Sequence, residues 1–304
     1  MDAGSIAGDL RIWTAGALAL ALLTGETGIP SSELIVIALM VQMTLSLDGL
    51  RFSVEDIREN GREMLLSMFL SYGINTAATL GIGILFAGFS PEIWHGWILL
   101  ASMPCAISVV TAAVLMKGSI KSAVVAVAAT YMGGMVLTPL ISFALLGDAV
   151  NPLEILKYIV LFIAVPVLAS IPLGKLHLSR RLKVPLIDMM MAVMLFLSVS
   201  SNRGYLFSYP WMALAVICAA SIRLLLLIGI SRFLMDRLKV SPASRPVFHV
   251  ICVWKNTGLS VSMCMVLLAD TPESVIPCFI CMILESLWFS LYTRGTAPPA
   301  PQNA

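Results

Sequence analysis

Four residues that could bind an ion or a charged ligand stand in the middle of an apolar stretch, FHVICVWKNTGLSVSMCMVLLAD, residues 248–270. Lys255 carries an ammonium group, Asn256 and Thr257 carry an amide and a hydroxyl, and Gly258 leaves the backbone free to bend. A lysine in apolar surroundings costs free energy, by about 2.5–3.5 kcal/mol at the centre of a membrane helix. Its presence therefore predicts either a functional group or one member of a structural ion pair.

Two further charged residues, Arg223 and Glu285, stand in other apolar stretches. Glu285 could neutralise either Arg223 or Lys255. A purely structural role for Lys255 therefore stays open beside a role in binding. Snorkelling of the lysine to the membrane surface is disfavoured by its central position in the stretch.

The composition places these residues inside a membrane. The chain of 304 residues is 59% hydrophobic and only 12% charged, with a mean hydropathy of +0.95, whereas soluble domains are about 45–50% apolar and about 25% charged. A membrane helix needs about 20 apolar residues. The sequence predicts an all-α membrane protein with ten spans, at residues 10–25, 33–50, 63–88, 93–116, 120–146, 153–174, 186–201, 210–235, 243–269 and 274–292.

The basic residues predict the orientation of these spans. Lysine and arginine accumulate in cytoplasmic loops, and nearly all of the 19 in this chain fall on one side of the ten-span arrangement. Lys157 and Arg203 fall on the other side, and Lys255 and Arg223 lie within spans. We expect a multi-pass protein of the cell membrane with both termini in the cytoplasm. Because membrane topology accounts for the distribution of the basic residues, we expect no nucleic-acid partner. We do expect the protein to contact membrane lipid.

The chain divides into two similar parts. Residues 1–150 hold the first five spans, residues 151–295 hold the other five, and residues 296–304 are expected to be a disordered tail. Pro104 interrupts the fourth span, and the residues from Asn256 to Gly258 interrupt the ninth. An odd number of spans in each half inverts the second half, as in many secondary transporters, whose binding sites lie where broken helices meet. The sequence therefore predicts two inverted five-helix repeats with broken crossing helices.

Three segments carry a resemblance to the bile acid:sodium symporter family. They are MVQMTLSLDGLRFSVEDI (residues 40–57), MPCAISVVTAAVLMKGSIKSAVVAVAATYMGGMVLTPL (residues 103–140) and WKNTGLSVSM (residues 254–263). The resemblance implies a core domain of spans three to five and eight to ten, and a panel domain of spans one, two, six and seven. It also implies transport of a small organic anion by alternating access.

The sequence departs from that family where its members bind sodium. The resemblance places aliphatic residues at five of the binding positions, Ser71 at a glutamine position and Lys255 at another glutamine position; the aliphatic residues are Val109, Val110, Ala123, Val127 and Ile251. Hard cations need oxygen ligands, so the usual sodium sites are expected to be lost. We expect the ammonium of Lys255 to replace sodium. Desolvation disfavours the charged form of a lysine, so this group could also bind and release a proton.

The remaining candidate residues lie near these breaks or in neighbouring spans. Ser108, Thr111, Asn256 and Thr257 could bind substrate or ion, and Ser71 and Asn75 could face the same crevice at helical spacing. Asn75 could equally form an interhelical hydrogen bond. His249 is expected to be a structural histidine, with a proton relay as the alternative. Gln42 could reach the substrate from the panel side.

Several alternatives remain for the function. The protein could be an ordinary sodium:organic-anion symporter that uses the hydroxyls of Ser108, Thr111 and Thr257, an arsenite-type anion exporter that uses Cys105, or a receptor that moves nothing. The CxxC pair Cys278 and Cys281 stands on an apolar helix, where packing is expected rather than a metal or redox site. No Walker sequence, HExxH or catalytic-triad pattern occurs, so neither an enzyme nor a cofactor is expected.

Overall fold

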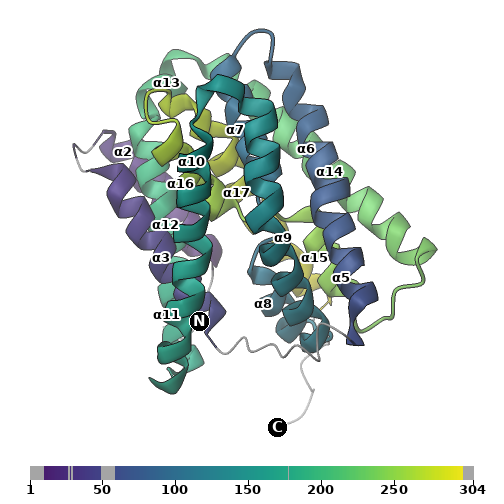
Figure 1. Ribbon diagram of the computed structural model, residues 1–304. Helices are drawn as coiled ribbons and strands as arrows, with labels where there is room; N and C mark the ends of the chain where they lie inside the picture. The colour runs from purple at the N-terminus through teal and green to yellow at the C-terminus, as the bar shows by residue number, and fades with distance from the viewer. Residues whose placement is uncertain (1–9, 27, 29, 49–58, 177, 297–304) are drawn as a thin grey trace.

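The regular secondary structure of the described residues is helical throughout (Figure 1). The computed structural model describes residues 10–26, 28, 30–48, 59–176 and 178–296. Six of the described helices are long and apolar enough to cross a membrane: Gly61–Phe86, Ile120–Leu146, Leu153–Leu173, Leu182–Ser201, Pro210–Arg237 and Pro272–Thr293. The chain is therefore an integral multi-pass membrane protein.

Several of these six membrane helices consist of more than one helical element, and two of them contain a π-helix. Up to residue 150 the elements are α2 (Leu10–Thr24), α3 (Ser31–Leu47), α5 (Gly61–Met68), the π-helix η1 (Phe69–Asn75), α6 (Thr76–Gly83), η2 (Ile84–Phe86), α7 (Pro91–Ser102), α8 (Ser108–Leu115), α9 (Ile120–Leu146) and η3 (Gly147–Ala149). After it come α10 (Pro152–Ile159), the π-helix η4 (Val160–Ala164), α11 (Val165–Leu173), η5 (Gly174–Leu176), α12 (Arg180–Ser201), α13 (Arg203–Ser208), α14 (Pro210–Arg237), α15 (Arg245–Val253), α16 (Thr257–Leu267), η6 (Pro272–Val275) and α17 (Ile276–Thr296).

The helix bounds differ from the predicted spans mainly at charged ends. Helix α9 begins and ends at the predicted residues, whereas α12 begins at Arg180 rather than at residue 186, and α14 continues to Arg237. The apolar run that predicts a span ends at the first charged residues, whereas the hydrogen-bonded backbone of the helix continues through them. The tail was predicted to begin at Thr296, yet Thr296 is the last residue of α17. Residues 49–50 of the second predicted span and residues 297–304 of the tail lie outside the described residues.

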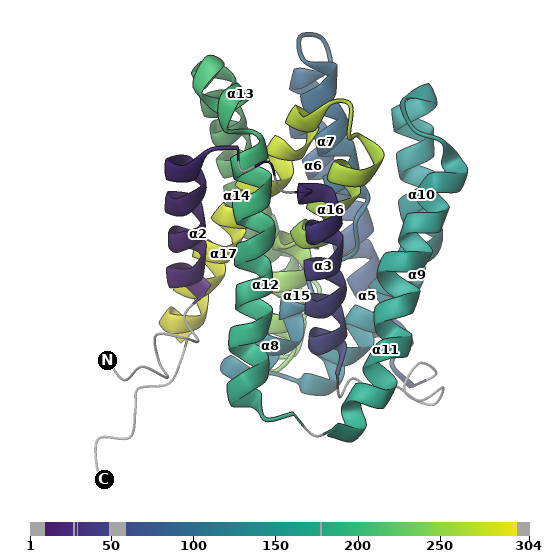
Figure 2. The same ribbon diagram turned by 90° about the vertical axis from the view of Figure 1, so that its left-hand side faces the viewer.

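The helices pack in two groups. Helix α12 packs against α2 and α3, and α11 packs against α3, so that α2, α12 and α3 stand in a row (Figure 2). In the second group, α14 packs against α15 and α17, and α5 packs against α9. Figure 1 shows α2, α3 and α12 on the left and α5, α6 and α14 on the right. Contacts of α3 with α16 and of α2 with α17 join the groups.

Two helical segments of the second group are interrupted, one between α7 and α8 and the other between α15 and α16. The chain leaves the helical conformation between α7 and α8, at residues 103–107, and between α15 and α16, at residues 254–256. We call these two stretches together the crossing, because Cys105 and Lys255 pair across it as an isolated antiparallel bridge. One break contains Pro104, as the sequence predicts.

The other break differs from the prediction at Gly258. This glycine is helical and lies in the first turn of α16, so the unwound stretch precedes it. The cause is Asn256, whose side-chain oxygen accepts a hydrogen bond from the backbone N–H of Leu259 (3.0 Å) and starts the helix at Thr257. A Cβ atom at Gly258 would approach Met194 at 3.2 Å and Gln42 at 3.3 Å. Close packing, not unwinding, accounts for the glycine.

Candidate functional site

The two non-helical segments of the crossing form backbone hydrogen bonds with each other. The N–H of Asn256 donates to the carbonyl of Pro104 (2.8 Å), and the N–H of Ala106 donates to the carbonyl of Trp254 (3.1 Å). Non-helical backbone at membrane depth is tolerated only where it is buried in protein or lines a cavity. The crossing therefore holds both breaks in one place.

Side chains from three other segments complete the C-terminal end of α7. The last carbonyls of a helix have no partner within it. Three donors reach them here: Thr76 Oγ1 donates to Ala101 O (2.7 Å), Thr138 Oγ1 to Ser102 O (2.6 Å) and Lys255 Nζ to Met103 O (2.7 Å). The ammonium thus lies at the end of a helix where positive charge is favoured.

Lys255 is fully buried and is bound by neutral groups. Its Nζ donates to Thr76 Oγ1 (3.0 Å) as well as to Met103 O, and it lies 4.6 Å from the centroid of the Tyr72 ring. Among the described residues no carboxylate lies within 4.0 Å of it. Of the two partners that were open for Glu285, Lys255 is therefore not the one in this structure, and the positive charge at the crossing has no counter-ion among these residues.

Asn256 is held on both sides of its amide. Its oxygen accepts from the N–H of Leu259, and its nitrogen donates to the hydroxyl of Tyr131 (2.5 Å). Both Asn256 and the adjacent Thr257 are buried. This network fixes the orientation of the first turn of α16 at the crossing.

A pocket opens between the crossing and the other group of helices. Its volume is about 430 Å³, including space open to solvent. Its lining comes from α3, α12 and the two breaks: Gln42, Met43, Ser46, Ala106, Ile107, Ser108, Ile187, Met191, Trp254, Lys255, Asn256, Thr257 and Gly258. The first residues of α8 and α16 are among them. Helix N-termini carry positive partial charge, and Lys255 in the lining carries an ammonium group, so the pocket is suited to a negatively charged group.

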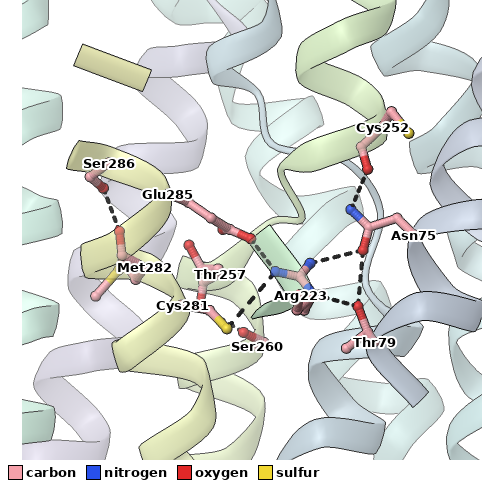
Figure 3. Close-up of polar contacts among 10 residues, drawn as sticks. All are labelled: Asn75, Thr79, Arg223, Cys252, Thr257, Ser260, Cys281, Met282, Glu285 and Ser286. Carbon is pink, nitrogen blue, oxygen red and sulfur yellow. Dashed lines mark hydrogen bonds and ion pairs between the residues drawn. The ribbon is translucent and has the colours of Figure 1, made fainter. Parts of the chain in front are cut away.

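A second buried charge site, which we call the arginine cluster, lies between α6, α14 and α17 (Figure 3). Arg223 pairs with Glu285 at 2.7 Å, and both side chains are at most 1% exposed. The guanidinium also donates to Asn75 Oδ1 (2.8 Å) and Thr79 Oγ1 (2.6 Å), and it contacts Cys281 Sγ at 3.9 Å. The second carboxylate oxygen of Glu285 is buried without a partner among the described residues.

Neighbouring residues of the third predicted span connect the arginine cluster to the crossing. Asn75, in the cluster, donates through Nδ2 to the carbonyl of Cys252 (2.9 Å), near the C-terminal end of α15. The next residue, Thr76, binds Lys255. A movement of this span would therefore change the contacts of both Arg223 and Lys255.

Some predicted site residues come together at the pocket and others do not. Ser108, Thr257 and Gln42 line it together with Lys255 and Asn256. Thr111 is exposed and lies outside its lining.

Ser71 and Asn75 are buried but do not line the pocket. Their expected register assumed an α-helix, whereas residues 69–75 form a π-helix, whose hydrogen bonds span one more residue. Asn75 binds the arginine cluster, and Ser71 Oγ is buried without a hydrogen-bond partner among the described residues.

Two other candidates lie away from the pocket opening. Cys105 is fully buried at the crossing, where its sulfur contacts Thr130 Oγ1 at 3.1 Å. His249 is buried in α15 and its Nδ1 hydrogen-bonds to Ser231.

Five hydroxyl-bearing residues that bind the crossing or the arginine cluster escaped the sequence analysis: Tyr72, Thr76, Thr79, Tyr131 and Thr138. Each is a common packing residue in membrane helices when taken alone. A usable signal was the density of polar residues in SYGINTAAT (residues 71–79), which is high for a membrane span.

Comparison with known families gives a match over most of the chain. The model of the SBF-like CPA transporter family matches residues 10–287. No curated protein matches the chain.

Proposed function

The chain belongs to the SBF-like CPA transporter family and is a membrane transporter, and we propose that it is a secondary transporter of a small organic anion. The observation that carries this proposal is a fully buried lysine, without a carboxylate partner among the described residues, beside a pocket at the junction of two broken helices. Such junctions are the binding sites of many secondary transporters. We propose alternating access as the mechanism.

We propose that the chain forms ten spans in two inverted repeats. Besides the six long helices, α2 and α3 are shorter apolar helices, and the pairs α7–α8 and α15–α16 make two broken segments. The breaks fall in the fourth and ninth of these segments, which are equivalent positions in the halves 1–150 and 151–295. The crossing of the breaks supports this arrangement.

We further propose that the two groups of helices are a panel domain and a core domain that move relative to each other. The panel would comprise spans one, two, six and seven, and the core the other six. The pocket supports this division, because α3 and α12 line one side of it and the crossing lines the other. Motion between the groups would expose the pocket alternately to the two sides of the membrane.

The ammonium of Lys255 would act as a fixed cation in place of sodium. It is bound by one hydroxyl, one backbone carbonyl and an aromatic face. The resemblance to the bile acid:sodium symporters places it at one of their sodium-binding positions. The side chains of Val109, Val110, Ala123, Val127 and Ile251 offer no oxygen. A tethered cation removes the need for a diffusible one.

The buried charges support an anionic substrate. At the crossing and the arginine cluster, Lys255 and Arg223 are two cations and Glu285 is one anion, so these two sites carry one positive charge in excess when all three groups are ionised. The further buried acid, Asp188, lies on α12 and is not part of the pocket lining. Burying an unpaired charge is costly. Substrate binding would offset that cost, and so would loss of a proton from the lysine. Proton coupling or uniport would therefore replace sodium coupling.

The test is transport by purified protein in proteoliposomes, with a bile acid and a set of small carboxylates as probes. Uptake should not depend on replacing sodium by choline, and it should depend on pH. Lys255→Gln should abolish the pH dependence. Lys121→Gln is the matched control, because Lys121 is an exposed lysine that is paired with Glu59 (3.3 Å) and lies outside the pocket lining. Unchanged pH-dependent transport in Lys255→Gln would refute the role of the lysine.

The alternative functions differ in what supports them. Sodium coordination by hydroxyls would use Ser108 and Thr257 in the pocket but loses Thr111, which is exposed. Arsenite-type efflux needs an accessible thiol, whereas Cys105 is fully buried. A receptor that moves nothing has no structural feature in its favour within the described residues.

A further inference from the structure

A second polar cavity lies where α14 and α17 end and α15 begins. Its volume is about 580 Å³, including open space, and it is lined by Arg232, Met235, Asp236, Arg245, His249 and Tyr292. No residue is shared with the pocket at the crossing. We call it the α15 cavity. The hydrogen bond from Arg62 to the carbonyl of Leu238 (2.9 Å) places the start of α5 at the same end of the molecule.

His249, which lines this cavity, has one ring nitrogen without a hydrogen-bond partner among the described residues. The residue is only 4% exposed, its Nδ1 hydrogen-bonds to the hydroxyl of Ser231, and its Nε2 is buried with no hydrogen-bond partner among the described residues. The rings of Trp288 (5.5 Å between centroids) and Tyr292 (4.7 Å) fix the imidazole plane. A buried polar atom normally has a partner. A ligand in the cavity that reaches Nε2 would supply the missing partner.

The charges around the cavity favour an anion. Arg232 and Arg245 supply two positive charges, and Asp236 supplies one negative charge. Asp236 holds Arg245 (2.8 Å), and Arg245 Nε donates to the carbonyl of Val240 (3.1 Å). This arginine is therefore fixed at the cavity while one positive charge remains in excess. Arg232 is exposed and lines the same cavity.

We propose that the α15 cavity binds a phosphomonoester. The tetrahedral group offers several oxygens, enough for two guanidinium groups and one imidazole, and guanidinium matches phosphate geometry. Near neutral pH a phosphomonoester carries one proton part of the time, since its second pKa is about 6. Its P–OH can donate to a neutral Nε2, or its oxygen can accept from a protonated one.

The phosphomonoester could belong to a lipid headgroup or to a soluble molecule. Basic pockets between helices near a membrane surface bind lipid headgroups, and the stacked pair Trp288 and Tyr292 (5.3 Å) is typical of the membrane interface. The two sources share the same chemistry at the cavity. They differ in whether the ligand must be in the bilayer.

The experiment measures the melting temperature of the full-length protein at constant ionic strength. The soluble probe is glycerol 3-phosphate, added to protein in nanodiscs of phosphatidylcholine. The lipid probe is phosphatidic acid, included in the nanodiscs. Each probe that binds should raise the melting temperature of the wild type. Arg232→Gln should weaken the apparent affinity by about tenfold, which is about 1.4 kcal/mol.

Two further variants make the result specific. Arg237→Gln is the matched control, because Arg237 is an exposed arginine of the same helix outside the cavity lining, and it should bind as the wild type does. His249→Phe keeps an aromatic ring but lacks Nε2, so it should weaken binding as well. A rise with glycerol 3-phosphate would identify a soluble ligand, and a rise with phosphatidic acid alone would identify a lipid.

The proposal is overturned if neither probe raises the melting temperature, or if Arg232→Gln and Arg237→Gln weaken binding equally. The second result would mean attraction to general basic charge. Because binding is measured without transport, failure here leaves the proposed transport function untouched.

Discussion

The crossing and the arginine cluster each bury a cation, but they treat it differently. Arg223 has a carboxylate at 2.7 Å and two further oxygen acceptors. Lys255 has one hydroxyl and one carbonyl, with no carboxylate within 4.0 Å among the described residues. A charge that is paired within the protein is suited to holding helices together. A charge without an opposite charge beside it is suited to exchanging partners during a transport cycle.

The two regions are nonetheless adjacent along the chain. Asn75 binds Arg223 and Thr76 binds Lys255. Substitutions at neighbouring positions can therefore test the difference between the two regions. Changes in the arginine cluster should mainly reduce stability, and changes at the crossing should mainly reduce transport.

The largest effect on stability is expected from Arg223→Met. It leaves the carboxylate of Glu285 buried and unpaired, which costs about 3–5 kcal/mol. The melting temperature in detergent measures this loss. The double variant Arg223→Met, Glu285→Met removes both charges and should recover much of it.

Arg237→Met serves as the control, because it removes an exposed arginine of the same helix. If the double variant is less stable than the single one, the ion pair does not dominate the energetics of this region.

A smaller effect on stability, with a complete effect on transport, is expected from Lys255→Met. Two hydrogen bonds are lost, but removing an unpaired buried charge offsets part of their contribution, so we expect a loss below about 3 kcal/mol. Proteoliposome uptake should fall to background. A variant that is as unstable as Arg223→Met would indicate that the lysine is chiefly structural.

A pair of isosteric substitutions should separate the two regions. Thr76→Val removes the hydroxyl that meets Lys255 and Ala101, and Thr79→Val removes the one that meets Arg223 and Asn75. Each should cost about 1–2 kcal/mol of stability. The pH dependence of transport should change in Thr76→Val alone. Equal changes in both variants would show that the two charges act as one unit.

The smallest effects should come from the hydroxyls near α8. Ser108→Ala should weaken substrate affinity by less than about tenfold, or about 1.4 kcal/mol, because Ser108 lines the pocket. Thr111→Val should leave affinity unchanged, because Thr111 lies outside the lining. Apparent KM values for uptake measure the change in affinity in both variants. A larger effect at Thr111 would place substrate on the exposed face of α8.

The sequence predicts the helical membrane architecture because apolar run length is a property of the residues themselves. The break at Pro104 was predicted because proline removes a backbone donor, although Pro139 lies inside the unbroken helix α9, so a proline alone does not determine a break. The start of α16 at Thr257 did not follow, because Asn256 could either unwind the chain or cap a helix. The cap, visible only in the structure, moves the break ahead of Gly258.

The partner of each buried charge could not be predicted. Glu285 could neutralise either Arg223 or Lys255, and only the packing of α14 against α17 selects the arginine. The π-helix at residues 69–75 likewise changes the register that sequence spacing assumes. Its consequence is that Asn75 serves the arginine cluster, while Thr76, which the sequence analysis passed over, binds the lysine.

The most direct test of the lysine as a fixed cation is a sodium titration of the purified protein. The melting temperatures of wild type and Lys255→Gln are measured at constant ionic strength, with choline as the balancing ion. A ligand that binds only the folded state adds about 2.7 kcal/mol at a hundredfold excess over Kd. We expect no sodium-specific rise in the melting temperature of the wild type. A specific rise would rule out the fixed-cation role of Lys255, because sodium would then bind with the ammonium in place.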